Sequence, residues 1–166
     1  MNKEKKLSLA VKILPFAFAF HNIEEALYVS SPKSPLQTLF TVSPIQFIVA
    51  VSLFTFLGFI LIFGKKFYPT NKSYQYAVTG FTGMLFLNSF FPHIFSAIIF
   101  KNYTPGVITA TFLLLPLTIY IIYNIWKSQQ LFMKQLIIAT FLGGILGIIL
   151  VFVFLAIGHI LSDIHL

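Results

Sequence analysis

The sequence predicts an all-α integral membrane protein, a bundle of about five transmembrane helices. Of its 166 residues, 58% are hydrophobic and only 9% are charged, and the mean hydropathy is +0.92. These values lie far outside the composition of soluble domains. Five apolar stretches are each long enough to cross a bilayer, which takes about 20 residues. They are continuous rather than alternating, so we expect helices and not the short strands of a barrel.

The expected spans follow one another along the whole chain. In order, they lie near residues 9–30, 44–64, 75–99, 106–126 and 135–161. Polar, lysine-rich or proline-rich segments separate them, and nothing is left over for a second domain, so residues 1–166 are expected to form one transmembrane helical domain. A charged segment precedes the first span, as in a signal peptide, but no small-residue cleavage pattern follows. We expect this span to be retained.

Lysine placement predicts the orientation. The chain has eleven lysines and no arginine. Nine flank the expected spans on one side of the membrane: Lys3, Lys5, Lys6, Lys12, Lys65, Lys66, Lys72, Lys127 and Lys134. Only Lys33 and Lys101 fall on the other side, and cytoplasmic loops are the lysine-rich ones. We therefore expect a multi-pass protein of the cell inner (plasma) membrane, with the N-terminus inside and the C-terminus outside.

The net charge of +7 raises the question of a nucleic-acid partner. The lysines lie between apolar runs and not along one face, and they form no basic-aromatic module. We therefore expect no nucleic acid among the partners. The chain also has no cysteine, which excludes thiolate metal sites and leaves His, Glu, Asp and Asn as ligand types.

A polar cluster interrupts the first span. His21, Glu24 and Glu25 have i, i+3 and i, i+4 spacing, which lets both carboxylates reach the volume that the imidazole faces. A charge near the bilayer centre costs on the order of 3 kcal/mol, and two adjacent carboxylates cost more unless they are neutralised. Lys12 is more than two helical turns away. We therefore expect a divalent metal or a carboxyl pair that shares a proton, in preference to a self-satisfied packing cluster.

The third span carries a second polar group. Asn88 and His93 fall at the level of the first-span cluster when both helices run outward. Pro92 has no N–H to pair with the carbonyl of Asn88, so a kink is predicted there. On an ideal helix Asn88 and His93 are about 140° apart, so they share a site only if the kink rotates them together. We expect His93 as a second imidazole, and Asn88 either as a site residue or as a cap for the broken backbone.

The fifth span contributes a weaker candidate and a packing motif. His159 lies near its outer end and is a candidate third histidine ligand, although an interfacial histidine is ordinarily solvated. Asp163 and His165 are interpreted as tail. Gly143 and Gly147 lie one turn apart and form a surface for close helix approach. We expect packing within the chain first, and a homodimer seam as the alternative.

Two stretches resemble a known family. "HNIEEA" in the first span and "LNSFFPHIFSAIIFKNYTPGVITATFLLLPLTIY" further on resemble the bacterial and archaeal membrane family named for its HXXEE motif. The resemblance implies a metal-binding or catalytic role for the motif, with no established activity for the family. Within the second stretch, Thr109 would face the site. Tyr103 would cap it from the loop, or else belong to an interfacial aromatic belt.

These residues favour an intramembrane metal-dependent enzyme of the hydrolase type. Zn²⁺, or Fe as the other choice, would be bound by His21, by Glu24 or Glu25, and by His93. The carboxylate that is not bound would act as general base on a metal-activated water. The expected partners are membrane lipid and an apolar or lipid-like substrate that enters between helices.

Three other functions stay open at this point. A metal-free isomerase would use the glutamate pair and His21 for acid–base chemistry. A proton-coupled or cation-coupled transporter would bind and release its ion at the same carboxylates. That reading is less favoured because the chain shows no internal repeat. A structural assembly subunit is disfavoured by the cost of the buried carboxylates.

Overall fold

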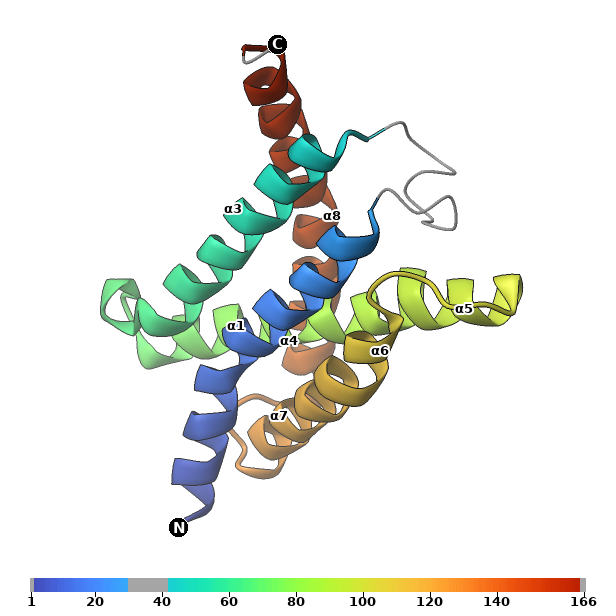
Figure 1. The fold of residues 1–166 in the computed structure, drawn as a ribbon. Coiled ribbons are helices and arrows are strands. Elements are labelled where there is room, and N and C mark those ends of the chain that lie inside the picture. Colours follow the sequence, from blue (N-terminus) through green and yellow to red (C-terminus); the bar gives the residue numbers. More distant parts are fainter. Residues whose placement is uncertain (1, 30–41, 165–166) are drawn as a thin grey trace.

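The computed structural model describes residues 2–29 and 42–164 (Figure 1). This part of the chain is entirely helical and contains five helices that are long and apolar enough to cross a membrane: Glu4–Tyr28, Pro44–Phe63, Asn71–Phe100, Val107–Lys127 and Met133–Ser162. The predicted fold class, an all-α protein with five candidate spans, is confirmed. Which end faces the cytoplasm stays a prediction.

The first two spans begin at polar caps. Helix α1 (Lys3–Tyr28) starts where the Asn2 side chain accepts a hydrogen bond from the Glu4 backbone N–H at 3.1 Å. Helix α3 (Pro44–Phe63) starts with a capping box, in which the Ser43 hydroxyl accepts from the Gln46 N–H at 3.1 Å. Such caps satisfy N–H groups that have no partner inside the helix. They therefore fix where each span begins.

The third span is broken, as the proline predicted. It consists of α4 (Asn71–Asn88), the kinked segment η2 (Ser89–Ile94) and α5 (Phe95–Phe100). Phe91 has extended backbone angles, φ −128° and ψ 118°, immediately before Pro92. The chain therefore changes direction between α4 and α5, and it does so beside His93.

A short loop separates the third span from the fourth. The fourth span comprises α6 (Val107–Thr109), η3 (Ala110–Leu114) and α7 (Leu115–Lys127), and Gly106 with a positive φ of 83° precedes it. The short turn η1 (Lys65–Phe67) connects α3 to α4, and α8 (Met133–Ile164) is the last helix. The N-terminus and the α7–α8 connection lie at one end of the molecule, and the C-terminus lies at the other (Figure 1).

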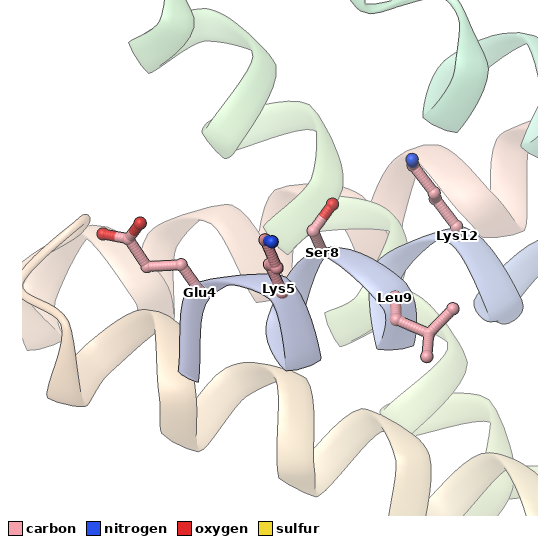
Figure 2. Close-up of a pocket in the computed structure, with 5 residues that line it drawn as sticks. All are labelled: Glu4, Lys5, Ser8, Leu9 and Lys12. Carbon is pink, nitrogen blue, oxygen red and sulfur yellow. The ribbon is translucent and has the colours of Figure 1, made fainter. Parts of the chain in front are cut away.

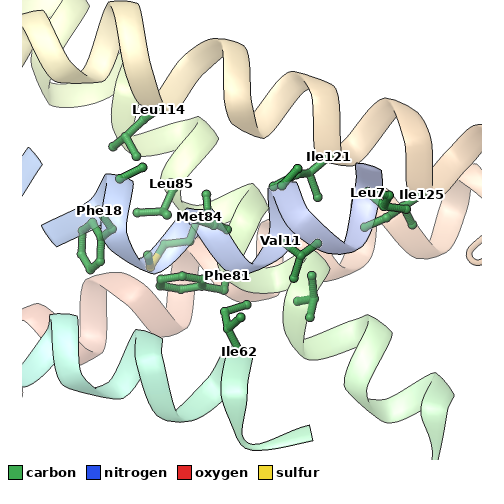
Figure 3. Packing of buried hydrophobic residues seen from close by; sticks show 14 of the residues in the cluster. Leu7, Val11, Phe18, Ile62, Phe81, Met84, Leu85, Leu114, Ile121 and Ile125 are labelled. Carbon is green, nitrogen blue, oxygen red and sulfur yellow. The ribbon is translucent and has the colours of Figure 1, made fainter. Parts of the chain in front are cut away.

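The core forms where α1 packs against the third and fourth spans. Figure 3 shows buried side chains from α1, α3, α4 and the fourth span in one cluster: Leu7, Val11, Phe18, Ile62, Phe81, Met84, Leu85, Leu114, Ile121 and Ile125. Many other large apolar side chains are exposed, among them Phe56, Ile98, Phe112, Phe132 and Phe141. A surface of this kind suits contact with lipid chains better than contact with water.

Helix α8 packs against α4 through small residues. A Cβ atom added to Gly143 would overlap the backbone of Gly80, and one added to Gly147 would meet the Met84 side chain at 2.5 Å. A Cβ atom at Gly83 would likewise overlap the Thr140 side chain. The motif of Gly143 and Gly147 therefore serves close helix packing within the chain, which is the use that the sequence favoured.

The lysine-rich end of α1 carries a shallow pocket. Figure 2 shows it lined by Glu4, Lys5, Ser8, Leu9 and Lys12, all from this one helix. All five residues are exposed. The pocket lies at the opposite end of α1 from Glu24 and Glu25, so it is separate from the polar cluster.

The orientation can be tested directly because the chain contains no cysteine. Lys66 and Lys101 are both exposed and lie in connections at opposite ends of the third span. In intact cells a membrane-impermeant maleimide should label Lys101→Cys, and it should label Lys66→Cys only after the membrane is permeabilised. The reverse labelling pattern would overturn the orientation predicted from the lysines.

Candidate metal centre

Three of the predicted site residues meet at one point between α1 and the kinked segment. His21 and Glu25 are four residues apart on α1 and so share a face, and His93 comes from η2. One ligand atom of each residue lies within 4.8 Å of the others. Glu25 Oε1 is 3.3 Å from His93 Nε2 and 3.9 Å from His21 Nε2. We call these three residues the HEH cluster.

Burial differs within the HEH cluster. His21 is 0% exposed and His93 is 3% exposed, whereas the Glu25 side chain is 18% exposed. The two imidazole rings lie 4.6 Å apart and nearly perpendicular, at 88°. Glu25 is therefore the most accessible member of the cluster, and both imidazoles are buried.

The kink brings Asn88 and His93 together. Asn88 Nδ2 lies 3.2 Å from His93 Nε2 and 3.4 Å from His21 Nε2. An unbroken α-helix would place the two side chains about 140° apart. The extended conformation of Phe91 removes that separation. The kink thus rotates Asn88 and His93 together, as the sequence analysis required for a shared site, and Asn88 lines the HEH cluster.

His93 is held from behind by the loop after α5. Its Nδ1 lies 2.9 Å from the carbonyl oxygen of Pro105. A carbonyl only accepts hydrogen bonds, so Nδ1 carries the hydrogen and donates it, and Nε2 is left with a lone pair. The Thr104 hydroxyl also donates to the His93 carbonyl oxygen at 3.2 Å. This pattern, in which one ring nitrogen donates to a carbonyl and the other keeps a lone pair, is typical of metal-binding histidines.

Gly106 lies against all three members of the HEH cluster. A Cβ atom there would come within 2.7 Å of His93 Cε1, 2.8 Å of His21 Cε1 and 2.9 Å of Glu25 Cγ. Its φ of 83° is also a conformation that other residues rarely adopt. The backbone of the loop can therefore approach the cluster only because this residue has no side chain.

Glu24 turns away from the HEH cluster. Its carboxylate accepts hydrogen bonds from the Tyr103 hydroxyl at 2.8 Å and from the Ile108 N–H at 3.3 Å. It also accepts from the Thr109 N–H at 2.8 Å and from the Thr109 hydroxyl at 2.6 Å. The N–H groups belong to the first turn of the fourth span, where they have no helical partner. The two adjacent glutamates, treated as interchangeable in the sequence, thus have different surroundings.

Tyr103 caps Glu24 from the loop. Its ring packs edge-on against Tyr28, with centroids 5.3 Å apart. Burial, and then the hydrogen bond to Glu24, raise the pKa of the Tyr103 phenol above its usual range. Tyr103 therefore stays a hydrogen-bond donor to Glu24 at neutral pH.

The structure does not bring His159 to the HEH cluster. His159 is exposed on α8, and its neighbour Gly158 packs against the backbone of Gln46 at the start of α3. The prediction of His159 as a third histidine ligand is therefore not supported by its position. His165 lies outside the described residues.

Sequence reasoning missed the contact between the Pro105 carbonyl and His93. The Pro105 carbonyl fixes His93, and Gly106 packs on both imidazoles. The available signal was the Pro-Gly pair itself, since a glycine directly before a helix often marks a positive φ or a close approach.

The comparisons with known proteins cover the same residues. A family described as "Protein of unknown function with HXXEE motif" matches residues 12–121, which include the HEH cluster and the loop above it. The chain is 32% identical over 139 residues to the uncharacterized protein YrkK of Bacillus subtilis (strain 168), across 82% of this chain and 87% of that protein. No solved structure matches the chain. His21, Glu24 and Glu25 supply the motif letters, and the chain belongs to the HXXEE-motif family.

Proposed function

We propose that this protein is an intramembrane metal-dependent enzyme of the hydrolase type. The HEH cluster is the observation that carries the proposal. Two imidazole nitrogens and one carboxylate oxygen lie within 4.8 Å of one another, and both imidazoles are buried. Two histidines and one glutamate are a ligand set of catalytic zinc sites, in which the fourth position is kept for water or substrate.

The donor set favours Zn²⁺, with Fe as the alternative. Imidazole suits both metals, and two histidines with one carboxylate also bind non-haem iron. When bound, such an ion would supply Lewis acidity and a water of lowered pKa. Asn88 Nδ2 lies 3.4 Å from His21 Nε2 and 3.2 Å from His93 Nε2. A bound ion would take the lone pairs of these two nitrogens, and the Asn88 hydrogens could then be donated to an oxygen that develops negative charge.

Glu25 is the carboxylate that can take part in proton transfer. Glu24 already accepts four hydrogen bonds from the loop and from the fourth span, so it is poorly placed to act as general base. Glu25 has two oxygens, of which one is enough to hold an ion, and its side chain is the most exposed of the HEH cluster. We therefore assign the base function to Glu25.

An apolar or lipid-like substrate fits the surroundings of the HEH cluster. The segment that carries His93 exposes Phe90 and Phe91, and α1 exposes Leu27 close to Glu25 in sequence. Lipid-facing apolar surface thus adjoins the cluster on both of its elements. A substrate could approach from the bilayer with its polar bond directed at Glu25, in what the lysines predict to be the outer half of the plasma membrane.

A metal-free isomerase is the second candidate. The observation that favours it is the direct contact of 3.3 Å between Glu25 Oε1 and His93 Nε2. A proton shared across this contact could be delivered to, and recovered from, an apolar substrate such as an alkene. This candidate needs no ion between the two side chains.

Metal content separates the two candidates. The protein purified in mild detergent should contain a stoichiometric divalent ion, measured by mass spectrometry. Glu25→Gln and His93→Ala should each lose it, because each removes a ligand. His159→Ala should keep the ion, because His159 lies away from the HEH cluster. A folded wild-type protein without metal, which also fails to take up added Zn²⁺ or Fe²⁺, would overturn the proposal and favour the isomerase.

The hydrolase part needs a separate measurement. Wild-type protein in lipid bicelles should cleave fluorogenic esters with long acyl chains. Glu25→Gln should not cleave them, although it should be as well folded as the wild type. His159→Ala should cleave them at the wild-type rate. Metal-loaded protein that cleaves none of a series of lipid esters and amides would contradict the hydrolase assignment and leave the metal site standing.

A further inference from the structure

One hydroxyl group links Glu24 to the HEH cluster. Thr109 Oγ1 lies 2.6 Å from Glu24 Oε2 and 2.9 Å from His21 Nδ1. The carboxylate, the hydroxyl and the imidazole thus form a hydrogen-bonded series that ends at the His21 ring of the HEH cluster. Glu24 and Thr109 are 85 residues apart in the sequence, so this contact depends on the fold and not on local helix geometry.

The donors and acceptors in this series can be assigned from hydrogen-bond chemistry. A threonine hydroxyl has a single hydrogen to donate. Both of its other neighbours, the Glu24 carboxylate and the Gly106 carbonyl at 3.3 Å, can only accept. Thr109 therefore donates to one of these oxygens and must accept from His21. It follows that His21 Nδ1 carries the hydrogen and that Nε2 presents a lone pair to Glu25 and His93.

Asn88 supports the same assignment from the other side of the ring. The amide nitrogen of Asn88 has two hydrogens, and it lies 3.4 Å from His21 Nε2 and 3.2 Å from His93 Nε2. Each ring nitrogen can accept one of them only if it is unprotonated. His93 already has its hydrogen on Nδ1, where Pro105 accepts it. The contacts on both imidazoles are therefore satisfied together by one arrangement of hydrogens.

We propose that Glu24 and Thr109 are positioning residues that fix His21 in the tautomer with hydrogen on Nδ1. The two glutamates of the motif then have different roles. Glu25 faces the ion, and Glu24 orients the histidine that binds it. The link to metal binding rests on the proposed function, whereas the tautomer of His21 does not depend on any ion. Glu24 is then neither a ligand nor a general base, which revises its predicted role.

Nitrogen-15 NMR tests the tautomer without metal. Histidine-labelled, metal-stripped protein should show His21 with hydrogen on Nδ1, its signals being identified by their loss in His21→Ala. Thr109→Val keeps the branched shape but removes the hydroxyl, so it should shift His21 to a mixture of tautomers. Thr109→Ser should restore the wild-type signals. Thr118→Val is the matched control, since it removes another buried hydroxyl from the same span, one that donates to the Leu115 carbonyl.

Metal affinity provides the second readout. Loss of a side chain that orients a metal ligand typically lowers affinity about 10- to 100-fold, which we expect for Thr109→Val and for Glu24→Ala. Because both act through His21, the double variant should lose no more than the larger single loss. Thr118→Val should bind as wild type does.

The outcomes distinguish this inference from the proposed function. Hydrogen on Nε2 of His21 in the wild type, an unchanged tautomer in Thr109→Val, or additive losses in the double variant would overturn the positioning role. A wild type that binds no metal but shows the expected tautomer, altered in Thr109→Val, would sink the metal centre and support the positioning role.

Discussion

Gly106→Ala is expected to abolish the metal binding proposed for the HEH cluster. The added methyl group would meet both imidazoles and Glu25 at 2.7 to 2.9 Å, and the residue would also have to keep its φ of 83°. Overpacking typically costs about 1–3 kcal/mol, and a left-handed conformation in a residue other than glycine adds about 1–3 kcal/mol. The loop can relieve this only by moving away, which withdraws the Pro105 carbonyl from His93. Metal titration of the purified variant measures the effect.

Pro105→Ala is the control for Gly106→Ala. It changes the adjacent residue but retains the backbone carbonyl that accepts from His93 Nδ1. We expect its metal affinity to stay much closer to that of the wild type. Equal affinities of Gly106→Ala and the wild type would show that the loop does not rest on the HEH cluster.

Gly143→Ala is expected to destabilise the whole fold. Its Cβ atom would overlap the backbone oxygen and carbonyl carbon of Gly80, and backbone atoms cannot rotate away as a side chain can. Helices α4 and α8 would have to separate, and we expect a cost of at least about 1–3 kcal/mol. The sign of the change in stability is informative, because alanine otherwise stabilises a helix by about 1 kcal/mol relative to glycine. The unfolding temperatures of the wild type and the variant, measured in the same detergent, test this expectation.

The neighbouring Gly144 supplies a matched control. A Cβ atom there meets only Leu87 Cδ1 at 3.0 Å, the end of a flexible side chain. Gly144→Ala should therefore unfold at the wild-type temperature or slightly above it. If Gly143→Ala and Gly144→Ala unfold at the same temperature, the packing of α8 on α4 is not as described.

Hydropathy predicted the five spans, but in two of them the helix extends several residues beyond the apolar stretch at its start. Helix α1 starts at Lys3 and not near residue 9, and α4 starts at Asn71 and not near residue 75. Both early turns are polar, so they add nothing to an apolar signal. Their stability comes from the side chains of Asn2 and Thr70, each of which accepts a backbone hydrogen bond. The kink at Pro92 was predictable because the loss of an N–H is a local property.

The site was predictable only as far as helix geometry reaches. Helical spacing placed His21 beside both glutamates. His93 was predicted to join them because it lies at the same expected depth in the membrane. Spacing could not decide between Glu24 and Glu25, because the choice depends on a loop that folds back from residues 103–109. It also could not exclude His159, because depth along the membrane normal says nothing about which helices are neighbours. Helix α8 packs on α3 and α4, and this packing keeps His159 away from the HEH cluster.

The distance along the chain between Glu24 and its partners affects how the protein is made. Thr109 follows Glu24 by 85 residues, so at typical synthesis rates it leaves the ribosome roughly 4 to 17 s later. Throughout that interval α1 exists without the hydroxyl and N–H groups that receive its carboxylate. The hydrogen bonds of Glu24 to the fourth span therefore cannot form until that span has been synthesised. Maturation of the site is thus a late event in biogenesis, although its first residues are among the earliest to be synthesised.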